Sequence, residues 1–288
     1  MIGNIFNIKS QTDFDQECKR TFDYQYQSIS IYKQYVDLIK QDGIPFLPIS
    51  FFKTHQIIAN SQTPEISFSS SGTTGQSRSL HPVADLKIYK QSFMTSFNMF
   101  YGSPENYCIL ALLPSYLERD GSSLILMADE LIKKSQNQNS GFYLNEYQLL
   151  SEILRTNQDK KIPTILLGVS YALLDLAEQF PQKLSSIIIM ETGGMKGNRP
   201  EMLKSQLHQT LCKAFHVKKI HSEYGMTELL SQAYSKENGM FHTPPWMKIQ
   251  IRDVYDPFST VETGKTGGIN IIDLANYYSC SFIQTDDL

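Results

Sequence analysis

Short apolar stretches that are typical of buried strands alternate with amphipathic stretches between residues 66 and 230. Segments 107–113, 164–167 and 186–190 are strongly apolar, and each precedes a stretch with apolar residues at helical spacing. Strands that are joined through helices run parallel, because the chain must cross over to return to the same edge of the sheet. The sequence therefore predicts an α/β fold, with a mainly parallel sheet and helices on both of its faces.

The pattern changes after residue 240. Segments 247–251 and 268–272 are typical of strands, and the sequence between them is rich in turn-forming residues. We therefore predict two domains, an α/β core of residues 1–240 and a small antiparallel β subdomain of residues 241–288. At the other end of the chain, residues 14–40 have apolar positions at helical spacing and are expected to form one or two helices.

Charge and cysteine content exclude several classes of protein. The chain of 288 residues has 26 basic and 29 acidic residues without a basic cluster, which argues against nucleic acid as a partner. Its apolar runs are too short to span a bilayer, and residues 1–4 do not begin a signal peptide. Four scattered cysteines are typical of reduced thiols, so we expect a cytoplasmic protein.

Segment 69–78 consists almost entirely of hydroxyl residues and glycine, and it lies between a predicted strand and a helix expected at 83–101. Glycine lets backbone N–H groups approach an anion, hydroxyl groups add donors, and Arg78 adds a fixed positive charge. The segment therefore predicts a phosphate-binding loop, with a serine-rich surface turn as the alternative. It lacks the Gly-Lys-Ser/Thr ending of the nucleoside triphosphatase loop. The candidate phosphate ligands are Ser70, Ser71, Gly72, Thr73, Thr74, Gly75 and Arg78.

A second candidate site is segment 224–228, Tyr-Gly-Met-Thr-Glu, which follows a strand expected at 218–221. The ring of Tyr224 offers a face for stacking, and the carboxylate of Glu228 is a hard ligand suited to a hard cation. The alternative is structural, with Tyr224 and Met226 in the core and Glu228 at the start of a helix, where an acidic residue suits the helix dipole.

In this order along the chain, the two segments resemble the phosphate loop and the aromatic-Gly-x-Thr-Glu segment of the adenylate-forming enzymes, the superfamily of acyl-CoA synthetases and luciferases. The resemblance implies the large N-terminal domain of that fold, with ATP and Mg²⁺ as cofactors. It implies that Arg78 replaces the usual lysine, that Tyr224 lies against adenine, and that Thr227 binds phosphate. It also implies that Glu228 holds Mg²⁺. Arg78, Thr227 and Glu228 are thus the expected catalytic residues, and Glu223, Gly225 and Met226 belong to the same nucleotide-binding segment.

Two further segments match the superfamily in the expected order. The glycine-rich turn at 192–196 resembles the turn that lines the adenine pocket, which implies roles for Gly193, Gly194 and Met195. The segment 282–287 resembles the aromatic-x-Thr-Gly-Asp motif, which implies that Asp287 binds the ribose hydroxyl groups. Asp286 stands where that motif has glycine.

Within the superfamily, five segments are similar to the LuxE-type acyl-protein synthetase family, the fatty-acid-activating component of the bacterial bioluminescence reductase complex. The family resemblance implies that the chain adenylates a fatty acid and transfers the acyl group to a protein thiol, with an acyl-CoA or acyl-protein reductase as a partner. It implies an acyl site that includes Tyr116, Ser122, Gly168 and Val169. The similar segments are 114–123 (residues 114–119, 122 and 123), 224–232, 245–253 (residues 245–247, 252 and 253), 272–276 and 285–288.

The family continues beyond the position that matches Leu288 with a segment that carries its acceptor cysteine. We therefore expect the C-terminal lid to be absent or truncated in this sequence, and we expect Cys280 to be a buried structural thiol. Two alternatives remain open. One is an AMP-forming acyl- or aryl-CoA ligase, and the other is a nucleotide-binding subunit without catalytic activity.

Overall fold

The computed structural model describes residues 4–40, 43–70, 78–114, 121–195 and 197–288. The chain divides into two compact units. Unit 1 contains residues 1–95, 226–231 and 243–288, and unit 2 contains residues 96–225 and 232–242. These units differ from the division expected at residue 240, because the N-terminal residues pack with the C-terminal strands rather than with the parallel sheet.

Unit 2 is built on a seven-stranded sheet with the order β10-β9-β8-β7-β6-β4-β5. The five strands from β8 to β5 are parallel, and only β9 and β10 are antiparallel to their neighbours. The sheet is therefore mainly parallel, as predicted. Its strands are β4 (Cys108–Leu112), β5 (Gly141–Phe142), β6 (Thr164–Val169), β7 (Ile187–Thr192), β8 (His221–Tyr224), β9 (Ala233–Ser235) and β10 (Phe241–His242).

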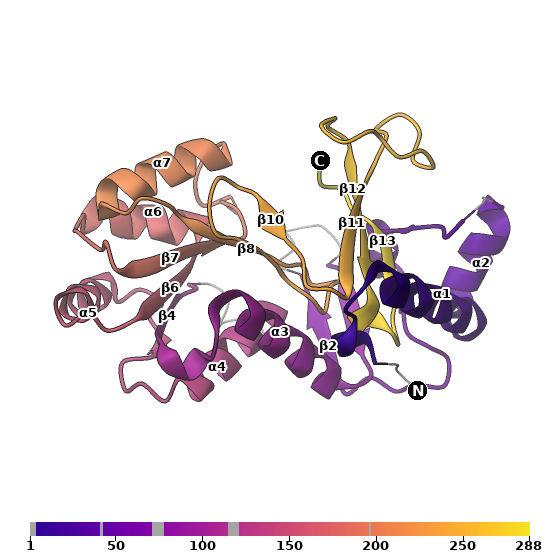
Figure 1. Ribbon diagram of the computed structural model, residues 1–288, viewed down its shortest axis with the longest axis horizontal. Helices are drawn as coiled ribbons and strands as arrows, with labels where there is room; N and C mark the ends of the chain where they lie inside the picture. Colours follow the sequence, from indigo (N-terminus) through magenta and orange to yellow (C-terminus); the bar gives the residue numbers. More distant parts are fainter. Residues whose placement is uncertain (1–3, 41–42, 71–77, 115–120, 196) are drawn as a thin grey trace. The chain divides into compact units, whose positions relative to one another are not determined.

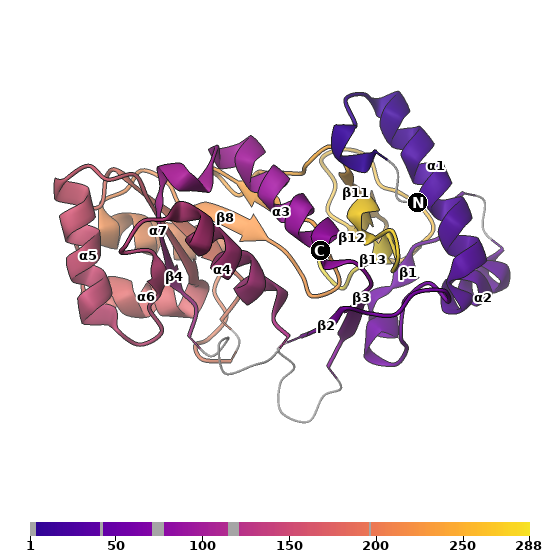
Figure 2. The ribbon, with the colours of Figure 1, turned by 90° about the horizontal axis from the view of Figure 1, so that it is seen from below.

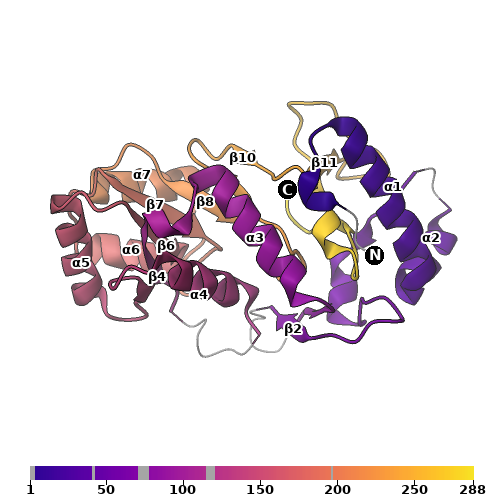
Figure 3. The same ribbon diagram turned by 60° about the horizontal axis from the view of Figure 1, so that its bottom comes forward.

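Helices cover both faces of this sheet. Figure 1 shows α6 and α7 on one face and α4 on the opposite face, and Figure 3 shows the same arrangement from another side. Every residue of β4 and β6 is buried as a result, which explains their uninterrupted apolar sequences. The helices of unit 2 are α4 (Ser123–Ser135), α5 (Tyr147–Asp159), α6 (Ser170–Gln179) and α7 (Lys204–Phe215), with the 3₁₀ helix η3 (Pro104–Asn106). Helix α3 (Leu86–Tyr101) begins in unit 1, and its residues from Ser96 onward belong to unit 2.

Unit 1 contains a four-stranded sheet with the order β1-β13-β12-β11. The antiparallel pairing of its three C-terminal strands agrees with the predicted β subdomain. The N-terminal region completes the sheet, because Leu47 pairs in parallel with Ile283. The strands are β1 (Leu47–Pro48), β11 (Met247–Arg252), β12 (Gly268–Asp273) and β13 (Phe282–Gln284), and the 3₁₀ helices of the unit are η1 (Ile5–Asn7), η2 (Ile49–Lys53) and η4 (Leu274–Asn276).

Two N-terminal helices, α1 (Gln11–Ser28) and α2 (Ser30–Ile39), pack on this sheet (Figure 2). The buried amide of Gln25 donates to the carbonyl oxygens of Asn276 and Tyr277 at 2.8 and 3.0 Å. The ring of Tyr32 stacks on Phe282, with 6.1 Å between the ring centroids. These contacts explain why the N-terminal residues belong to unit 1.

Unit 1 also contains a two-stranded antiparallel sheet of β2 (Ile66–Ser69) and β3 (Leu80–Val83). The predicted phosphate loop therefore connects the strands of a hairpin, whereas the sequence pattern indicated a loop between a strand and a helix of the parallel sheet. Strand β3 was missed because it is only four residues long and contains Pro82, which cannot donate to a strand ladder. Helix α3 begins three residues after β3.

Other boundaries also differ from the prediction. Helix α7 begins at Lys204 rather than near Glu201, and β8 begins at His221 rather than at Lys218. No helix starts at Glu228, so the dipole alternative for this residue is wrong. Within the described ranges, none of the helices has the length and apolar character needed to cross a membrane.

Candidate functional site

Glu228 in unit 1 is a buried carboxylate at the base of the predicted phosphate loop. Its side chain accepts a hydrogen bond from Ser79. Ser79 is in turn hydrogen-bonded to Ser70 across the hairpin. The N–H of Ser70 donates to the carbonyl oxygen of Ser79 at 3.0 Å, and the N–H of Ser79 donates to the hydroxyl of Ser70 at 3.0 Å. Ser79, which lies just outside the first motif, thus links one residue of each motif, Ser70 and Glu228. Ser71, Gly72, Thr73, Thr74 and Gly75 lie outside the described residues.

The ionisation of Glu228 is disfavoured by its surroundings. The residue is 5% exposed, and burial raises the pKa of its carboxyl despite the hydrogen bond from Ser79. Among the described residues, no lysine, arginine or histidine forms an ion pair with it, and the charge of Lys53, which lowers the pKa of the carboxyl, acts from beyond ion-pair distance. A buried carboxylate without a cationic partner is costly unless a cation binds there.

The preceding residue, Thr227, is held through its backbone. The Nδ1 atom of His81 lies 2.8 Å from the carbonyl oxygen of Thr227. His81 is fully buried on β3, and burial lowers its pKa to about 4. The neutral ring therefore donates from Nδ1, because a carbonyl oxygen can only accept. This bond fastens segment 226–231 to the hairpin.

Segment 226–231 is also held by hydrogen bonds to residues 273 and 276, which form a second anchor beside that of His81. The carboxylate of Asp273, which is 0% exposed, accepts hydrogen bonds from the N–H groups of Leu230 and Ser231 at 2.8 and 3.0 Å. The Ser231 hydroxyl also donates to it at 2.6 Å. Asn276 donates to the carbonyl oxygen of Glu228 at 2.7 Å. Segment 272–276 resembles the LuxE-type family, but no pattern in the sequence predicts this anchoring role.

The predicted ribose ligand lies at the end of the same unit. The backbone of Asp287 is fixed, because its N–H donates to the Thr285 hydroxyl at 3.2 Å and its carbonyl accepts from Ile269 at 2.9 Å. The residue itself is exposed. Arg78, at the end of the predicted phosphate loop, is also exposed. Both side chains are therefore accessible to a ligand.

Met226 lies in unit 1 with Thr227 and Glu228, whereas unit 2 carries six further predicted residues at the carboxyl ends of adjacent parallel strands, namely Gly168, Val169, Gly193, Gly194, Glu223 and Tyr224. In the sheet register, Val169 lies opposite Thr192, and Thr192 lies opposite Glu223. Gly193 and Gly194 directly follow β7, and Tyr224 ends β8. Ligands of open α/β sheets bind at this edge.

Several of these residues have structural roles that the sequence did not indicate. A Cβ atom on Gly168 would lie 2.7 Å from a methyl carbon of Leu173, so this glycine allows α6 to pack on the sheet. Val169 and Met195 are buried. The Ser122 hydroxyl caps α4 by accepting from the N–H of Ile125 at 3.4 Å. Tyr116 lies outside the described residues.

Gly225 is the last residue of unit 2 before the chain enters unit 1. A Cβ atom at this position would lie 2.6 Å from Oε1 of Glu223. The Glu223 carboxylate is held by the hydroxyl of Thr192, so it cannot move away freely. The division between the units therefore runs through the Tyr-Gly-Met-Thr-Glu segment, after a glycine whose environment excludes a side chain.

No cluster of three or more His, Cys, Asp or Glu side chains occurs in the part of the chain that the structure describes. Mg²⁺ is usually held by one or two carboxylates together with substrate phosphate oxygens and water. Glu228, as a single buried carboxylate linked through Ser79 to Ser70, fits that type of site.

The fold is that of the large N-terminal domain of the adenylate-forming enzymes. A solved structure of 2-hydroxyisobutyryl-CoA ligase with 2-HIB-AMP and CoA matches 97% of this chain and 64% of its own, with a TM-score of 0.71 and 12% identity. The same ligase in its postadenylation state gives a TM-score of 0.69 at 10% identity. MatB from Rhodopseudomonas palustris matches 75% of this chain and 40% of its own, with a TM-score of 0.51 and 12% identity.

The chain thus spans less than two thirds of these structural relatives. At such low identity, the similarity establishes the fold alone. No protein-family model and no curated protein sequence matches the chain.

Proposed function

We propose that this chain activates a carboxylic acid with ATP to give an acyl-adenylate, as an AMP-forming acid–thiol ligase. The observation that carries the proposal is Glu228, a buried carboxylate that lacks a cationic partner among the described residues and is tied through Ser79 to the base of the glycine- and hydroxyl-rich loop. The adenylate-forming fold supports it.

In the proposed reaction, a carboxylate oxygen of the acid attacks the α-phosphorus of ATP and the bond to pyrophosphate breaks. Residues 70–75 and Arg78 would bind the phosphate groups, and the guanidinium could bind two phosphate oxygens at once. Glu228 would hold Mg²⁺, which neutralises phosphate charge when it is bound. Thr227 would donate to a phosphate oxygen, and His81 would fix its backbone. The protein's contribution is positioning and charge stabilisation.

The remaining nucleotide contacts follow the sequence motifs. The ring of Tyr224 would lie against adenine, beside Gly193 and Gly194 at the same edge of the sheet. The exposed carboxylate of Asp287 would accept hydrogen bonds from the ribose hydroxyl groups. These assignments rest on the motif matches together with the accessibility of the residues.

We further propose that the acid is a fatty acid and that the acceptor is a protein thiol, as in the LuxE-type family, with a reductase as partner. The acyl chain would lie near Gly168 and Val169 at the end of β6, where neighbouring residues are apolar. Cys280 is not suited to be the acceptor, because it is fully buried and burial raises its pKa to about 12. Coenzyme A is the alternative acceptor, and it is favoured by the CoA ligases among the structural relatives.

The proposal is tested by ATP–pyrophosphate exchange with fatty, aromatic and amino acids as substrates. Exchange should require an acid and Mg²⁺, and Glu228→Gln should reduce it by roughly 10²–10³-fold, the usual cost of removing one stabilising group. Glu237→Gln, which alters an exposed carboxylate of unit 2, is the matched control and should retain full activity. Exchange that needs no acid, or that is unchanged in Glu228→Gln, would contradict the proposal.

A further inference from the structure

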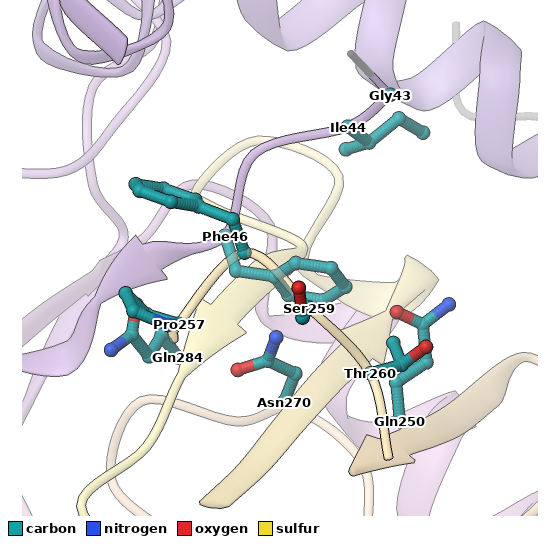
Figure 4. Close-up of a pocket in the computed structure, with 10 residues that line it drawn as sticks. Gly43, Ile44, Phe46, Gln250, Pro257, Ser259, Thr260, Asn270 and Gln284 are labelled. Carbon is teal, nitrogen blue, oxygen red and sulfur yellow. The ribbon is translucent and has the colours of Figure 1, made fainter. Parts of the chain in front are cut away.

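Three carboxamide side chains form a row across adjacent strands of unit 1. Gln250 on β11 lies opposite Asn270 on β12, and Asn270 lies opposite Gln284 on β13. Residues directly opposite one another on neighbouring strands point to the same face of a sheet. Figure 4 shows the three amides on one side of the sheet. We call these three residues the amide row.

The amide row lines a cavity of about 200 Å³. Phe46, from the segment that leads into β1, and Phe258 and Thr260, from the loop after β11, line it as well. None of the lining side chains carries a charge. The cavity is therefore a neutral, polar site with aromatic groups at its wall, and it does not include the residues proposed for nucleotide binding.

Much of the hydrogen-bonding capacity of the amide row is unused within the described structure. The side chains of Gln250 and Gln284 form no hydrogen bond with a described residue. Asn270 is only 4% exposed, and its Oδ1 accepts from Nη1 of Arg252 at 3.1 Å, whereas its NH₂ group has no described partner. Gln250 and Gln284 are half-buried and line the cavity, so their donors and acceptors are available to a ligand.

The chemistry of the cavity defines the ligand. The lining residues carry no charge, and the neighbouring guanidinium of Arg252 already donates to Asn270 and to the carbonyl oxygens of Ile269 and Thr285, which argues against an anion. A hydroxyl group both donates and accepts, so it matches either end of a carboxamide. The volume is below the range of about 300–1,000 Å³ that is usual for drug-sized ligands. We propose that the amide row binds a small uncharged polyhydroxy molecule of monosaccharide size, with an aromatic ring against its C–H face.

The proposal is tested by NMR on the ¹⁵N-labelled full chain, with D-glucose, D-ribose and glycerol as probes. Side-chain NH₂ signals of Gln250, Asn270 and Gln284, assigned from single variants, should shift on titration of at least one probe. Gln250→Ala combined with Gln284→Ala should weaken that binding about tenfold or more, because two hydrogen-bonding groups are lost. Gln148→Ala, an exposed amide on α5, is the matched control and should bind as the wild type does.

Three outcomes would overturn the proposal. The first is that no probe shifts the amide-row signals, and the second is that the shifts persist unchanged in the double variant. The third is that adenine shifts these signals while the polyhydroxy probes do not, which would make the cavity a nucleobase site. Because the wild-type signals are read directly, the first and third outcomes do not depend on whether a variant folds.

Discussion

The Nδ1 atom of His81 and the carbonyl oxygen of Thr227 are 2.8 Å apart, although 146 positions separate the two residues in the chain. The bond joins the β2–β3 hairpin, which carries the predicted phosphate loop, to the segment that carries Glu228. Phe52 packs edge-on against the imidazole, with 5.6 Å between the ring centroids, and the histidine is fully buried. The position of segment 226–231 relative to the β2–β3 hairpin within unit 1 therefore depends on a neutral histidine.

The first prediction is that unit 1 loses stability in mild acid because of His81. Burial lowers the pKa of His81 from 6.5 to about 4, so the unfolded chain binds the proton more tightly. The free energy of unfolding is therefore highest above pH 6.5, where His81 is neutral in both states. It decreases as the pH falls from 6.5 towards 4, because the histidine then binds a proton in the unfolded chain but not in the folded one. With about 1.4 kcal/mol for each pKa unit, the full loss is about 3–4 kcal/mol.

Denaturant unfolding at several pH values, followed by the fluorescence of Trp246, measures this effect, because the only tryptophan of the chain lies in unit 1. In the variant His81→Phe, the free energy of unfolding should depend less on pH between 6.5 and 4. His221 in unit 2 also has a pKa lowered to about 4, so His221→Gln is the control for a contribution from that unit. An unchanged slope in His81→Phe would contradict the prediction.

The second prediction concerns the anchor formed by Asp273. Asp273→Ala would leave the buried N–H groups of Leu230 and Ser231 without an acceptor, so we expect a loss of about 3–5 kcal/mol in the free energy of unfolding. Burial raises the pKa of Asp273, which means that its charged form is itself costly. Asp273→Asn, which keeps one acceptor and no charge, should therefore cost less than Asp273→Ala. Equal losses in the two variants would argue against this explanation.

The third prediction distinguishes two neighbouring aspartates. If Asp287 binds ribose, Asp287→Ala should weaken Mg-ATP binding in calorimetry by roughly tenfold or more, because two hydrogen bonds to a charged group are lost. Asp286→Ala is the matched control, since Asp286 is exposed and adjacent and stands where the family motif has glycine. Equal affinity of the wild type and Asp287→Ala would exclude the ribose assignment.

The fourth prediction is that Gly225→Ala destabilises the chain by about 1–3 kcal/mol, because the new methyl group would collide with the Glu223 carboxylate. Gly194→Ala is the control, since a Cβ atom there would meet no atom within 4 Å. The two variants are compared by their midpoints of urea unfolding. A larger shift for Gly194→Ala would contradict the explanation.

The sequence was sufficient for the fold class because the parallel strands are buried on both faces and are therefore recognisable as continuous apolar runs, such as Cys108–Leu112. It was not sufficient for β3 or for the two units. Strand β3 is short and contains a proline, and the pairing of Leu47 with Ile283 joins residues from opposite ends of the chain. Local patterns carry little information about such long-range contacts.

The candidate site shows the same contrast. The motifs single out Glu228 and Ser70 because binding loops have a distinctive composition, and the roles of both residues in ligand binding stay predictions. His81, Asp273 and Asn276 were missed as anchors, because a buried polar residue is indistinguishable in sequence from an exposed one. Their roles depend on which backbone atoms they meet in the folded chain.

The six residues 226–231 fold with unit 1, although the residues on either side, Gly225 and Gln232, belong to unit 2. In amide hydrogen exchange, the N–H groups of Leu230 and Ser231 should therefore follow the opening of unit 1, because Asp273 accepts both of them. The amides of β8 and β9 should instead follow the opening of unit 2. Along this short stretch, the amides should therefore exchange first with unit 2, then with unit 1, and then again with unit 2. Their exchange rates would report the local stability of both units.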